Sequence, residues 1–533
     1  SCPTQAIARI DPNRALTELR VPVATVIAKD AALETSPLPQ RAPAWPWVLG
    51  AAPSSSADED SHYIRMVGLS RGDVVGRDVP IDTPADGYTR HSGRQLQRLN
   101  VESGIYHLSP GELPADPCNR FRPAQPFVCA PRTPSATNEI RSYHARTLPM
   151  SYVIPALLSR LGTGAASKLV LGRLGFLVQA CALLVVAFVA CGRWLRRSPW
   201  AIGCVLTAMT PLAVYEFGVL APSGTEFAAV VSFTAALWRA LHDDEPRWWW
   251  LASALGAVAV LSRDTGLVLT VLSAAVVLSA VPGSVSRLRS IPLRQVLAYA
   301  AMPLLASGGA LWWRGHYQMT LPVTLRALRR GLNVSRVAHL AYDSVGRVGW
   351  LDTPLAAPFV VVWLVIGGAM IIRAAAVARP AARAAMLATL LWGVYNVLLS
   401  AALVPTGFPN QSRFSLPLLG AGALVVGLAA GRDAAQAGRR WLRVAAAAFG
   451  LIQLAMVLTA ARRSALGLDG WNLSLRGSLW TPPVGWAVVL AVAALGAVGV
   501  GALAWTNLAD EPGGPRLPAT GASTGRMRPR RVR

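Results

Sequence analysis

Long apolar runs are the feature of this sequence that most restricts its fold. Eleven runs approach or exceed the roughly 20 residues that an α-helix needs to cross a bilayer. With 53% hydrophobic and only 15% charged residues, the chain also differs from an ordinary soluble protein. It is therefore predicted to be an all-α integral membrane protein. The predicted spans cover residues 167–191, 199–220, 222–241, 247–262, 264–282, 294–313, 354–372, 384–404, 414–431, 441–460 and 484–506.

The positive charge of the chain predicts its orientation in the membrane. The formal net charge of +24 comes almost wholly from arginine, since Lys29 and Lys168 are the only lysines. The arginines gather in short loops between apolar runs, as the positive-inside rule describes, and not on one basic face that could bind nucleic acid. We therefore expect membrane lipids and no nucleic acid as partners. The charge bias places the polar segment 54–150 outside and the C-terminal tail in the cytoplasm.

Four regions are predicted along the chain. Residues 1–53 are irregular, without an initial Met, a signal pattern or a legible first span, which indicates a truncated or misframed N-terminus. Residues 54–150 form an extracytoplasmic loop long enough to have a small fold of its own. Residues 151–506 form the transmembrane domain, and residues 507–533 a basic cytoplasmic tail. A first helix before the long loop would raise the number of spans to about twelve.

Two cysteines in the long polar loop are predicted to form a disulfide bond. Cys118 and Cys129 lie in the stretch CNRFRPAQPFVC, with no other Cys or His close enough in sequence to complete a zinc site. An oxidising exterior favours disulfides. Three further cysteines lie in or beside apolar runs and are predicted to be packing residues, namely Cys181, Cys191 and Cys204.

The stretch SSSADEDSHYIRMVG, residues 54–68, is the most unusual polar motif. Ser56 and Glu59 have the spacing of a capping box, in which the hydroxyl and the carboxylate each accept a backbone N–H at a helix start. A helix that begins there would carry Asp58, His62 and Arg65 along one stripe. The simplest interpretation is a capped surface helix. The position of the motif, directly before most of the hydrophobic residues, also suggests a functional site.

Other polar groups are predicted to lie at the same, outer ends of the spans. Charges near the hydrocarbon are costly and are usually paired or functional. Each one alone could be a local ion pair, a helix cap or an interfacial anchor. Together on one face they predict a pocket. Besides the motif above, the set contains Glu226, Arg263, Asp264, Asp352, Gln411 and Arg413.

The motif ADEDSHYIRMVGLSRGD resembles the Asp-Glu-x-x-His signature of a family of uncharacterised bacterial multi-pass membrane proteins, a domain of unknown function. The resemblance continues, in the family's order, through TPLAVYEFGVLAPSGTEFAA, SRDTGLVL, VGRVGWLDTPL and QSRFSLPLL, and covers residues 45–430. One difference is Ala57, where the family usually has Pro. The family is grouped with the GT-C class of polyprenyl-phosphate-sugar glycosyltransferases. The resemblance thus implies a GT-C-like bundle of about 11–12 transmembrane helices in a bacterial plasma membrane.

The resemblance also implies an activity, namely transfer of a sugar from a polyprenyl-phosphate donor to a cell-envelope glycan or lipid acceptor on the outer face. That reaction needs a carboxylate to deprotonate the attacking hydroxyl and cations to hold the leaving phosphate. Asp58 and Glu59 are the candidates for the base, with His62 as their partner. Arg413 is the first candidate for the phosphate, because its planar fork suits phosphate oxygens, and Arg263 is the second. The other predicted pocket residues are Glu226, Asp264, Asp352 and Gln411.

Alternatives remain open from the sequence. No cofactor is predicted, although Asp58 and Asp60 form a DxD pattern that could bind a divalent ion through oxygen ligands. A lipid-linked-sugar flippase would use the same arginines to move a head group across the bilayer. Transporters, however, typically place charges near the midplane and contain internal repeats, which this sequence does not show. A third alternative is a non-catalytic protein of envelope assembly.

Overall fold

The computed structural model describes most of the chain after its first 44 residues. The described residues are 45–81, 83, 93–116, 118–128, 138–195, 198–243, 245–319, 324–332, 334–404, 410–431, 435–468 and 474–506. The chain divides into two compact units, Ser1–Ala42 and Pro43–Arg533. The first unit lies outside the described residues, as does the predicted cytoplasmic tail 507–533, so the fold described here is that of the second unit.

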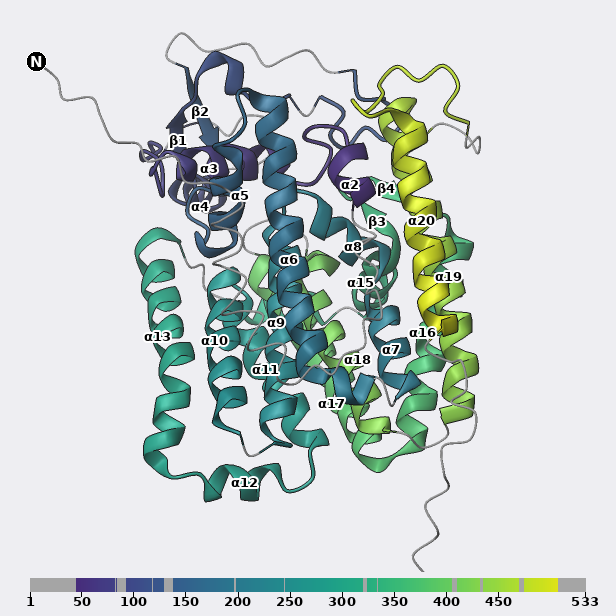
Figure 1. Ribbon diagram of the computed structural model, residues 1–533. Coiled ribbons are helices and arrows are strands. Elements are labelled where there is room, and N and C mark those ends of the chain that lie inside the picture. The colour runs from purple at the N-terminus through teal and green to yellow at the C-terminus, as the bar shows by residue number, and fades with distance from the viewer. Residues whose placement is uncertain are drawn as a thin grey trace, which may run out of the picture. The chain divides into compact units, whose positions relative to one another are not determined.

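The N-terminal part of this unit, up to Ser159, consists of short elements that lie together at one end of a helix bundle (Figure 1). The strands β1 and β2 form an antiparallel pair in which Gly104 faces Ser142 and His107 faces Glu139. In chain order the short elements are α2 (Trp45–Gly50), α3 (Glu59–Ser70), α4 (Arg94–Glu102), β1 (Gly104–His107), η1 (Pro110–Glu112), β2 (Glu139–Ser142), η2 (Met150–Tyr152) and α5 (Val153–Ser159).

Helices form the rest of the unit, so the all-α prediction is confirmed. A short hairpin of two-residue strands interrupts them. The elements are α6 (Ala165–Leu195), α7 (Pro199–Ala208), α8 (Pro211–Gly218), α9 (Pro222–Ala240), α10 (Pro246–Ser262), α11 (Gly266–Ala280), α12 (Ser284–Ser290), α13 (Leu293–Tyr317), α14 (Leu325–Gly331), α15 (Val334–Gly346), β3 (Arg347–Val348), β4 (Thr353–Pro354), α16 (Ala357–Val377), α17 (Arg379–Leu403), η4 (Ser412–Phe414), α18 (Leu416–Ala430), α19 (Ala435–Ala465) and α20 (Gly485–Thr506).

Each of the eleven predicted spans coincides with one of these helices or with a bent pair. By length and composition, however, only six described helices could cross a membrane, or eight if the bent pairs α7–α8 and α11–α12 each count as one span. The three remaining predicted spans are α9, α10 and α18, with 19, 17 and 15 residues. At 1.5 Å per residue, α18 is about 23 Å long, less than the ~30 Å hydrocarbon core.

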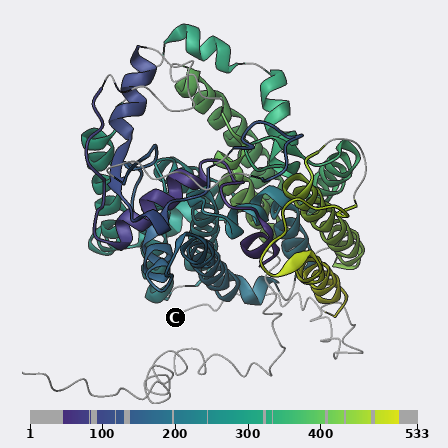
Figure 2. The same ribbon diagram turned by 90° about the horizontal axis from the view of Figure 1, so that it is seen from above.

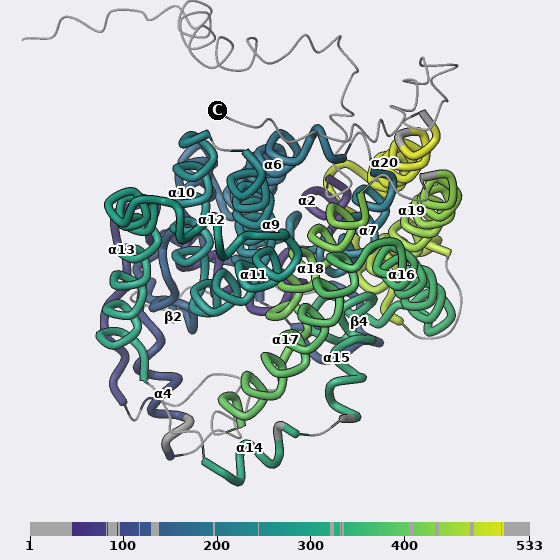
Figure 3. The backbone as a smooth tube through the Cα atoms, turned by 90° about the horizontal axis from the view of Figure 1, so that it is seen from below, coloured from purple at the N-terminus to yellow at the C-terminus, as the bar shows by residue number. Residues whose placement is uncertain are grey.

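Burial explains why two of these segments, α9 and α18, resemble spans in the sequence. α18 and α9 are buried over nearly their whole length, so they are apolar on all sides because other helices surround them. α13 is the opposite case, with only 6% of its spanning window buried. It lies at the edge of the bundle in the view from below (Figure 3), as a lipid-facing helix would. The apolar runs predict the helices well. They do not distinguish a helix that is surrounded by other helices from one that is long enough to cross the membrane.

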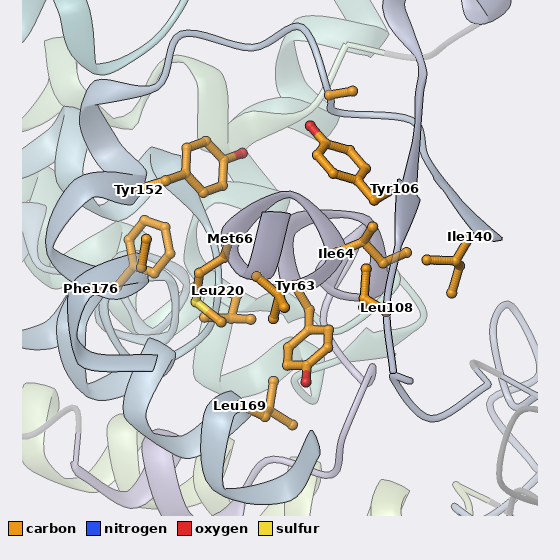
Figure 4. Packing of buried hydrophobic residues seen from close by; sticks show 13 residues of the cluster. Tyr63, Ile64, Met66, Tyr106, Leu108, Ile140, Tyr152, Leu169, Phe176 and Leu220 are labelled. Atoms are coloured by element: carbon orange, nitrogen blue, oxygen red, sulfur yellow. The ribbon is translucent and has the colours of Figure 1, made fainter. Parts of the chain in front are cut away.

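A buried cluster joins the short elements to the bundle. Tyr63, Ile64 and Met66 of α3 pack against Tyr106 of β1 and Phe176 of α6, among other residues (Figure 4). Aromatic side chains of this size bury large apolar areas and dominate core energetics. The cluster therefore holds the N-terminal end of α3 at a fixed place beside the bundle. The view from above shows these short elements lying across the helix ends (Figure 2).

Candidate functional site

The N-terminus of α3 differs from the predicted capping box. The helix begins at Glu59, and Asp58 occupies the N-cap position without a side-chain capping bond. Asp58 has a φ of 61°, in the left-handed region that non-glycine residues rarely adopt. The capping box with Ser56 is thus wrong, because the Glu59 carboxylate is bound elsewhere. A strained, uncapped carboxylate at a helix start is a feature often found at functional sites.

Glu59 is the acceptor in a fully buried ion pair. Arg173 of α6 donates to it through Nε and Nη2, at 2.8 and 2.7 Å, and the backbone N–H of Leu220 donates at 3.2 Å. The remaining guanidinium hydrogens bond to carbonyl oxygens at the end of α2 and in the loop after it, among them that of Ala51 at 2.7 Å. Both oxygens of Glu59 thus accept hydrogen bonds, and the ion pair joins α2, α3 and α6. A buried carboxylate bonded in this way is poorly placed to act as a base.

Asp58 lies beside an arginine and a histidine. Its Oδ2 is 3.0 Å from Nη2 of Arg413 and 3.6 Å from Nε2 of His144. Burial alone would raise the pKa of Asp58, but His144 and Arg413 outweigh burial and hold that pKa well below its usual 3.8. The carboxylate is therefore charged at neutral pH. It is also partly exposed, unlike Glu59, so that a hydroxyl group could reach it.

Two histidine rings stack beside this carboxylate. His62 and His144 lie 4.3 Å apart between ring centroids, and Nδ1 of His62 is 2.7 Å from the Tyr152 hydroxyl. Burial, and then the charge of His144, lowers the pKa of His62 well below 6.5, although Asp58 acts in the opposite direction. His62 is therefore neutral at pH 7 and fixed by Tyr152. Its predicted position beside Asp58 agrees with the structure.

His144 was not predicted from the sequence. It follows β2, where the Ser142 hydroxyl donates to the carbonyl of Ser61 at 2.8 Å and accepts the N–H of His144 at 3.2 Å. The guanidinium of Arg65, which lies on the predicted stripe, donates to the carbonyl oxygens of Ala145 and Thr147. The turn is thus fixed against α3. Its only sequence signal is the position of SYHART at the end of the polar loop, just before the bundle begins.

Arg413 and Arg263 contact the same aromatic ring. The guanidinium carbon of Arg263 lies 4.4 Å from the ring centroid of Phe414, and that of Arg413 lies 5.5 Å from it. Arg413 is in η4 and Arg263 directly follows α10. Two guanidinium groups around one ring form a compact positive site. The two predicted phosphate-binding residues are therefore brought together next to Asp58.

This positive site has hydrogen-bonding capacity that the described residues do not use. Nε of Arg413 and Nη1 of Arg263 are buried without a hydrogen-bond partner, and Arg413 is only 5% exposed. The nearest carboxylate to Arg263 is Glu226 Oε2, at 4.0 Å, which also lacks a hydrogen bond. Oε1 of Glu226 accepts from the Thr265 hydroxyl at 2.5 Å. Buried N–H groups of this kind are normally satisfied, and an anion is the kind of ligand that would accept hydrogen bonds from them.

The remaining predicted pocket residues separate into two groups. Asp264 accepts a hydrogen bond from Gln318 at 3.0 Å and lies exposed next to Arg263. Gln411 is two residues before Arg413, and its Oε1 lacks a partner. Asp352 instead lies in a separate buried ion pair with Arg463, at 2.9 Å, in the loop between β3 and β4. No described contact joins Asp352 to Asp58 or Arg413, so the structure does not bring it together with them.

The comparisons with known proteins identify the family. The sequence matches the family described as predicted membrane protein (DUF2142) over residues 45–421. The chain belongs to this family. The resemblance found in the sequence motifs is thereby confirmed, and this DUF2142 member is a multi-pass membrane protein. No curated protein matches the sequence.

Two solved structures are similar to this DUF2142 protein. One is the crystal structure of ArnT from Cupriavidus metallidurans bound to undecaprenyl phosphate, with a TM-score of 0.41, 14% identity, and coverage of 92% of this chain and 76% of that chain. The other is ArnT from the same organism in the apo state, with a TM-score of 0.40, 13% identity, and coverage of 93% and 76%. Similarity at this level does not transfer a ligand or an activity.

The disulfide and metal predictions are tested only in part. Cys118 is disulfide-bonded. Its predicted partner Cys129 lies outside the described residues, so this pairing stays a prediction. Within the described residues, no group of three or more His, Cys, Asp or Glu side chains could hold a metal ion. Asp60 is buried in α3, and it does not join Asp58 in such a group.

Proposed function

We propose that this protein is a GT-C-type glycosyltransferase of the bacterial plasma membrane. It transfers a sugar from a polyprenyl-phosphate donor to an envelope glycan or lipid acceptor on the outer face. The proposal rests chiefly on one observation, the 3.0 Å contact between Asp58 and Arg413 beside the unsatisfied guanidinium of Arg263. A partly exposed carboxylate and two cations with unused donors provide the groups that the reaction requires.

The two arginines bind the donor phosphate. Nε of Arg413 and Nη1 of Arg263 have no hydrogen-bond acceptor among the described residues, so phosphate oxygens can accept hydrogen bonds from both. Phe414 between them keeps both guanidinium planes in place. The polyprenyl chain then extends into the surrounding lipid. The leaving phosphate carries extra negative charge in the transition state, and the two cations stabilise it there.

Asp58 takes the proton of the acceptor. In the transfer step, the acceptor oxygen forms a bond to the anomeric carbon, the bond from that carbon to the phosphate oxygen breaks, and the hydroxyl proton moves to Oδ2 of Asp58. The bonding electrons leave with the phosphate, which remains on the lipid. The proton then leaves Asp58 for solvent, which reaches its partly exposed side chain. His62 stays neutral and keeps His144 stacked.

Donor binding prepares Asp58 for this role. Without a ligand, His144 and, to a smaller extent, Arg413 keep the pKa of Asp58 too low for an efficient base. A phosphate on Arg413 competes for the same guanidinium. Once Asp58 loses this partner, its pKa rises and the carboxylate can turn toward the acceptor. The base thus becomes effective only when the donor is present.

The test is sugar transfer in proteoliposomes. The donor is undecaprenyl phosphate linked to radioactive glucose, mannose or arabinose, and the acceptor is an extract of envelope lipids and glycans. Asp58→Asn should lower the transfer rate by roughly 10²–10⁴-fold, because a positioned base is lost. The matched control is Asp78→Asn, which removes an exposed carboxylate of the same segment. It should transfer at the parent rate.

Two results would contradict this proposal. In the first, Asp58→Asn transfers sugar as fast as the parent protein, so that the α3 motif is structural. In the second, neither protein transfers sugar, but labelled lipid-linked sugar crosses the bilayer in the presence of the parent protein. The flippase alternative would then replace the transferase.

A further inference from the structure

Four consecutive residues before and within η4 each have a buried polar atom without a hydrogen-bond partner. The atoms are Asn410 Oδ1, Gln411 Oε1, Ser412 Oγ and Arg413 Nε. A buried polar atom that loses its water and gains no partner typically costs about 1–3 kcal/mol, so folded proteins contain few of them. Four in succession, in a well-packed part of the chain, indicate a binding site whose ligand supplies the missing partners.

The segment is firmly held, so its unsatisfied atoms do not result from a loose loop. Nδ2 of Asn410 donates to the Asn396 carbonyl, to the Asn396 side chain and to the Ser400 hydroxyl, at 3.3, 3.2 and 3.0 Å. These three acceptors fix the orientation of the amide and leave Oδ1 as its free atom. The Tyr395 hydroxyl donates to the Phe414 carbonyl at 3.1 Å. Residues of α17 thus hold both ends of the segment.

The unsatisfied atoms are of two chemical kinds. Arg413 Nε and Arg263 Nη1 are donors and require an acceptor, such as a phosphate oxygen. The side-chain oxygens of Asn410, Gln411 and Glu226 are acceptors and require donors, and the Ser412 hydroxyl can be either. A phosphate group has no donors for three acceptors. The complementary ligand therefore combines a phosphate with several hydroxyl groups.

We propose that Asn410, Gln411, Ser412 and Glu226 bind the hydroxyl groups of the glycosyl moiety on the donor lipid and determine which sugar the protein accepts. This inference rests on the proposed function, because it places the sugar next to the phosphate held by Arg413. A site built to bind sugar hydroxyls discriminates strongly, since an analogue without one of them leaves a buried polar group unpaired. These residues are specificity determinants, separate from the proton transfer at Asp58.

The experiment measures binding, so it does not depend on transfer. The parent protein is placed in nanodiscs, and its dissociation constant for undecaprenyl phosphate is measured. The same is done for undecaprenyl phosphate that carries glucose, mannose or arabinose on its phosphate. At least one glycosylated lipid should bind tenfold or more tightly than undecaprenyl phosphate. Gln411→Leu and Ser412→Ala should each remove most of this advantage and leave the affinity for undecaprenyl phosphate within about twofold.

The matched control is Gln453→Leu. Gln453 of α19 is also a buried glutamine with an unpartnered Oε1, and its Nε2 donates to the Met209 carbonyl at 3.2 Å. This variant should keep the full preference for the glycosylated lipid. Ser412→Ala should also keep the parent melting temperature, because the Ser412 hydroxyl has no partner to lose. This second variant therefore keeps the test valid if Gln411→Leu folds poorly.

The proposal is overturned if the parent protein binds no glycosylated lipid more tightly than undecaprenyl phosphate, or if both variants keep the preference. The failure of the proposed function looks different. In that case the parent protein prefers the glycosylated lipid, and Gln411→Leu removes this preference, while no sugar is transferred. That result supports the sugar site and contradicts the transferase reaction.

Discussion

Nη2 of Arg413 lies 3.0 Å from Oδ2 of Asp58, although the two residues are 355 positions apart in the chain. The contact joins the N-terminus of α3 to η4, which precedes an interior helix of the bundle. It also places the candidate base next to the candidate phosphate site. Glu59, the neighbour of Asp58 in sequence, instead binds Arg173 and not Arg413. Two adjacent carboxylates therefore have different roles, which mutations can separate.

Glu59→Gln should destabilise the protein strongly. The change leaves the buried Arg173 guanidinium without its counter-charge, and breaking a buried ion pair of this kind typically costs about 3–5 kcal/mol. The melting temperature in detergent should fall by several degrees, together with the yield. The folded fraction should still bind undecaprenyl phosphate like the parent protein. Glu245→Gln is the control, because its partner Arg247 is exposed and exposed pairs contribute little.

A parent-like melting temperature for Glu59→Gln, combined with lost transfer, would contradict this assignment. It would return Glu59 to the catalytic role that the sequence suggested.

Lowering the pH should destabilise the protein through His62. Its pKa is depressed in the folded state, so the unfolded chain takes up a proton near pH 6.5 while the folded protein does not. The stability contributed by the neutral ring is thus present above about pH 6.5 and is lost as the pH falls toward the folded-state pKa. Between pH 7.5 and 5.5, His62→Asn should show a smaller loss of melting temperature than the parent.

The control for this pH series is His316→Asn on α13. The His316 side chain is exposed and stacks on Trp312, so the variant should keep the parent's dependence on pH. If the melting temperatures of His62→Asn and of the parent protein change equally with pH, His62 is not a neutral ring in the folded protein.

Replacing either arginine beside Phe414 with lysine should weaken lipid-phosphate binding. Arg413→Lys and Arg263→Lys keep the charge but lose the planar fork that can give two hydrogen bonds to one phosphate. We expect roughly tenfold weaker binding of undecaprenyl phosphate for each, measured in nanodiscs, because a hydrogen bond to a charged group contributes about 1.5–3 kcal/mol. Arg314→Lys, at the exposed end of α13, should bind like the parent protein. If both variants bind undecaprenyl phosphate as tightly as the parent protein, the two arginines are interfacial anchors and do not bind the phosphate.

The sequence predicted part of this site because charged groups next to apolar runs are conspicuous. Asp58, His62, Arg263 and Arg413 stood out for that reason, and the structure brings them together around Phe414 and His144. The helices were also predictable, since apolar runs of 15 residues or more in a chain this hydrophobic form helices whether they face lipid or protein.

Other features depend on contacts that no local pattern encodes. The role of Glu59 is set by Arg173, which lies inside the apolar run of α6 and resembles an interfacial anchor in sequence. His144 reaches Asp58 only because Arg65 and Ser142 fix the turn after β2. The positive φ of Asp58 cannot be deduced from the sequence ADEDSH. An apolar run alone does not tell whether a helix spans the membrane, because burial inside the bundle makes a helix as apolar as lipid does.

The central claim is that a donor phosphate displaces Asp58 from Arg413, and the most direct test is the affinity of undecaprenyl phosphate for Asp58→Asn. Without the carboxylate, Arg413 has no competing anion, so the variant should bind the lipid phosphate roughly tenfold more tightly than the parent protein while its transfer rate collapses. Tighter binding with lost catalysis is the predicted result. Unchanged or weaker binding of undecaprenyl phosphate by Asp58→Asn would contradict the displacement of Asp58 from Arg413 and the proposed active site.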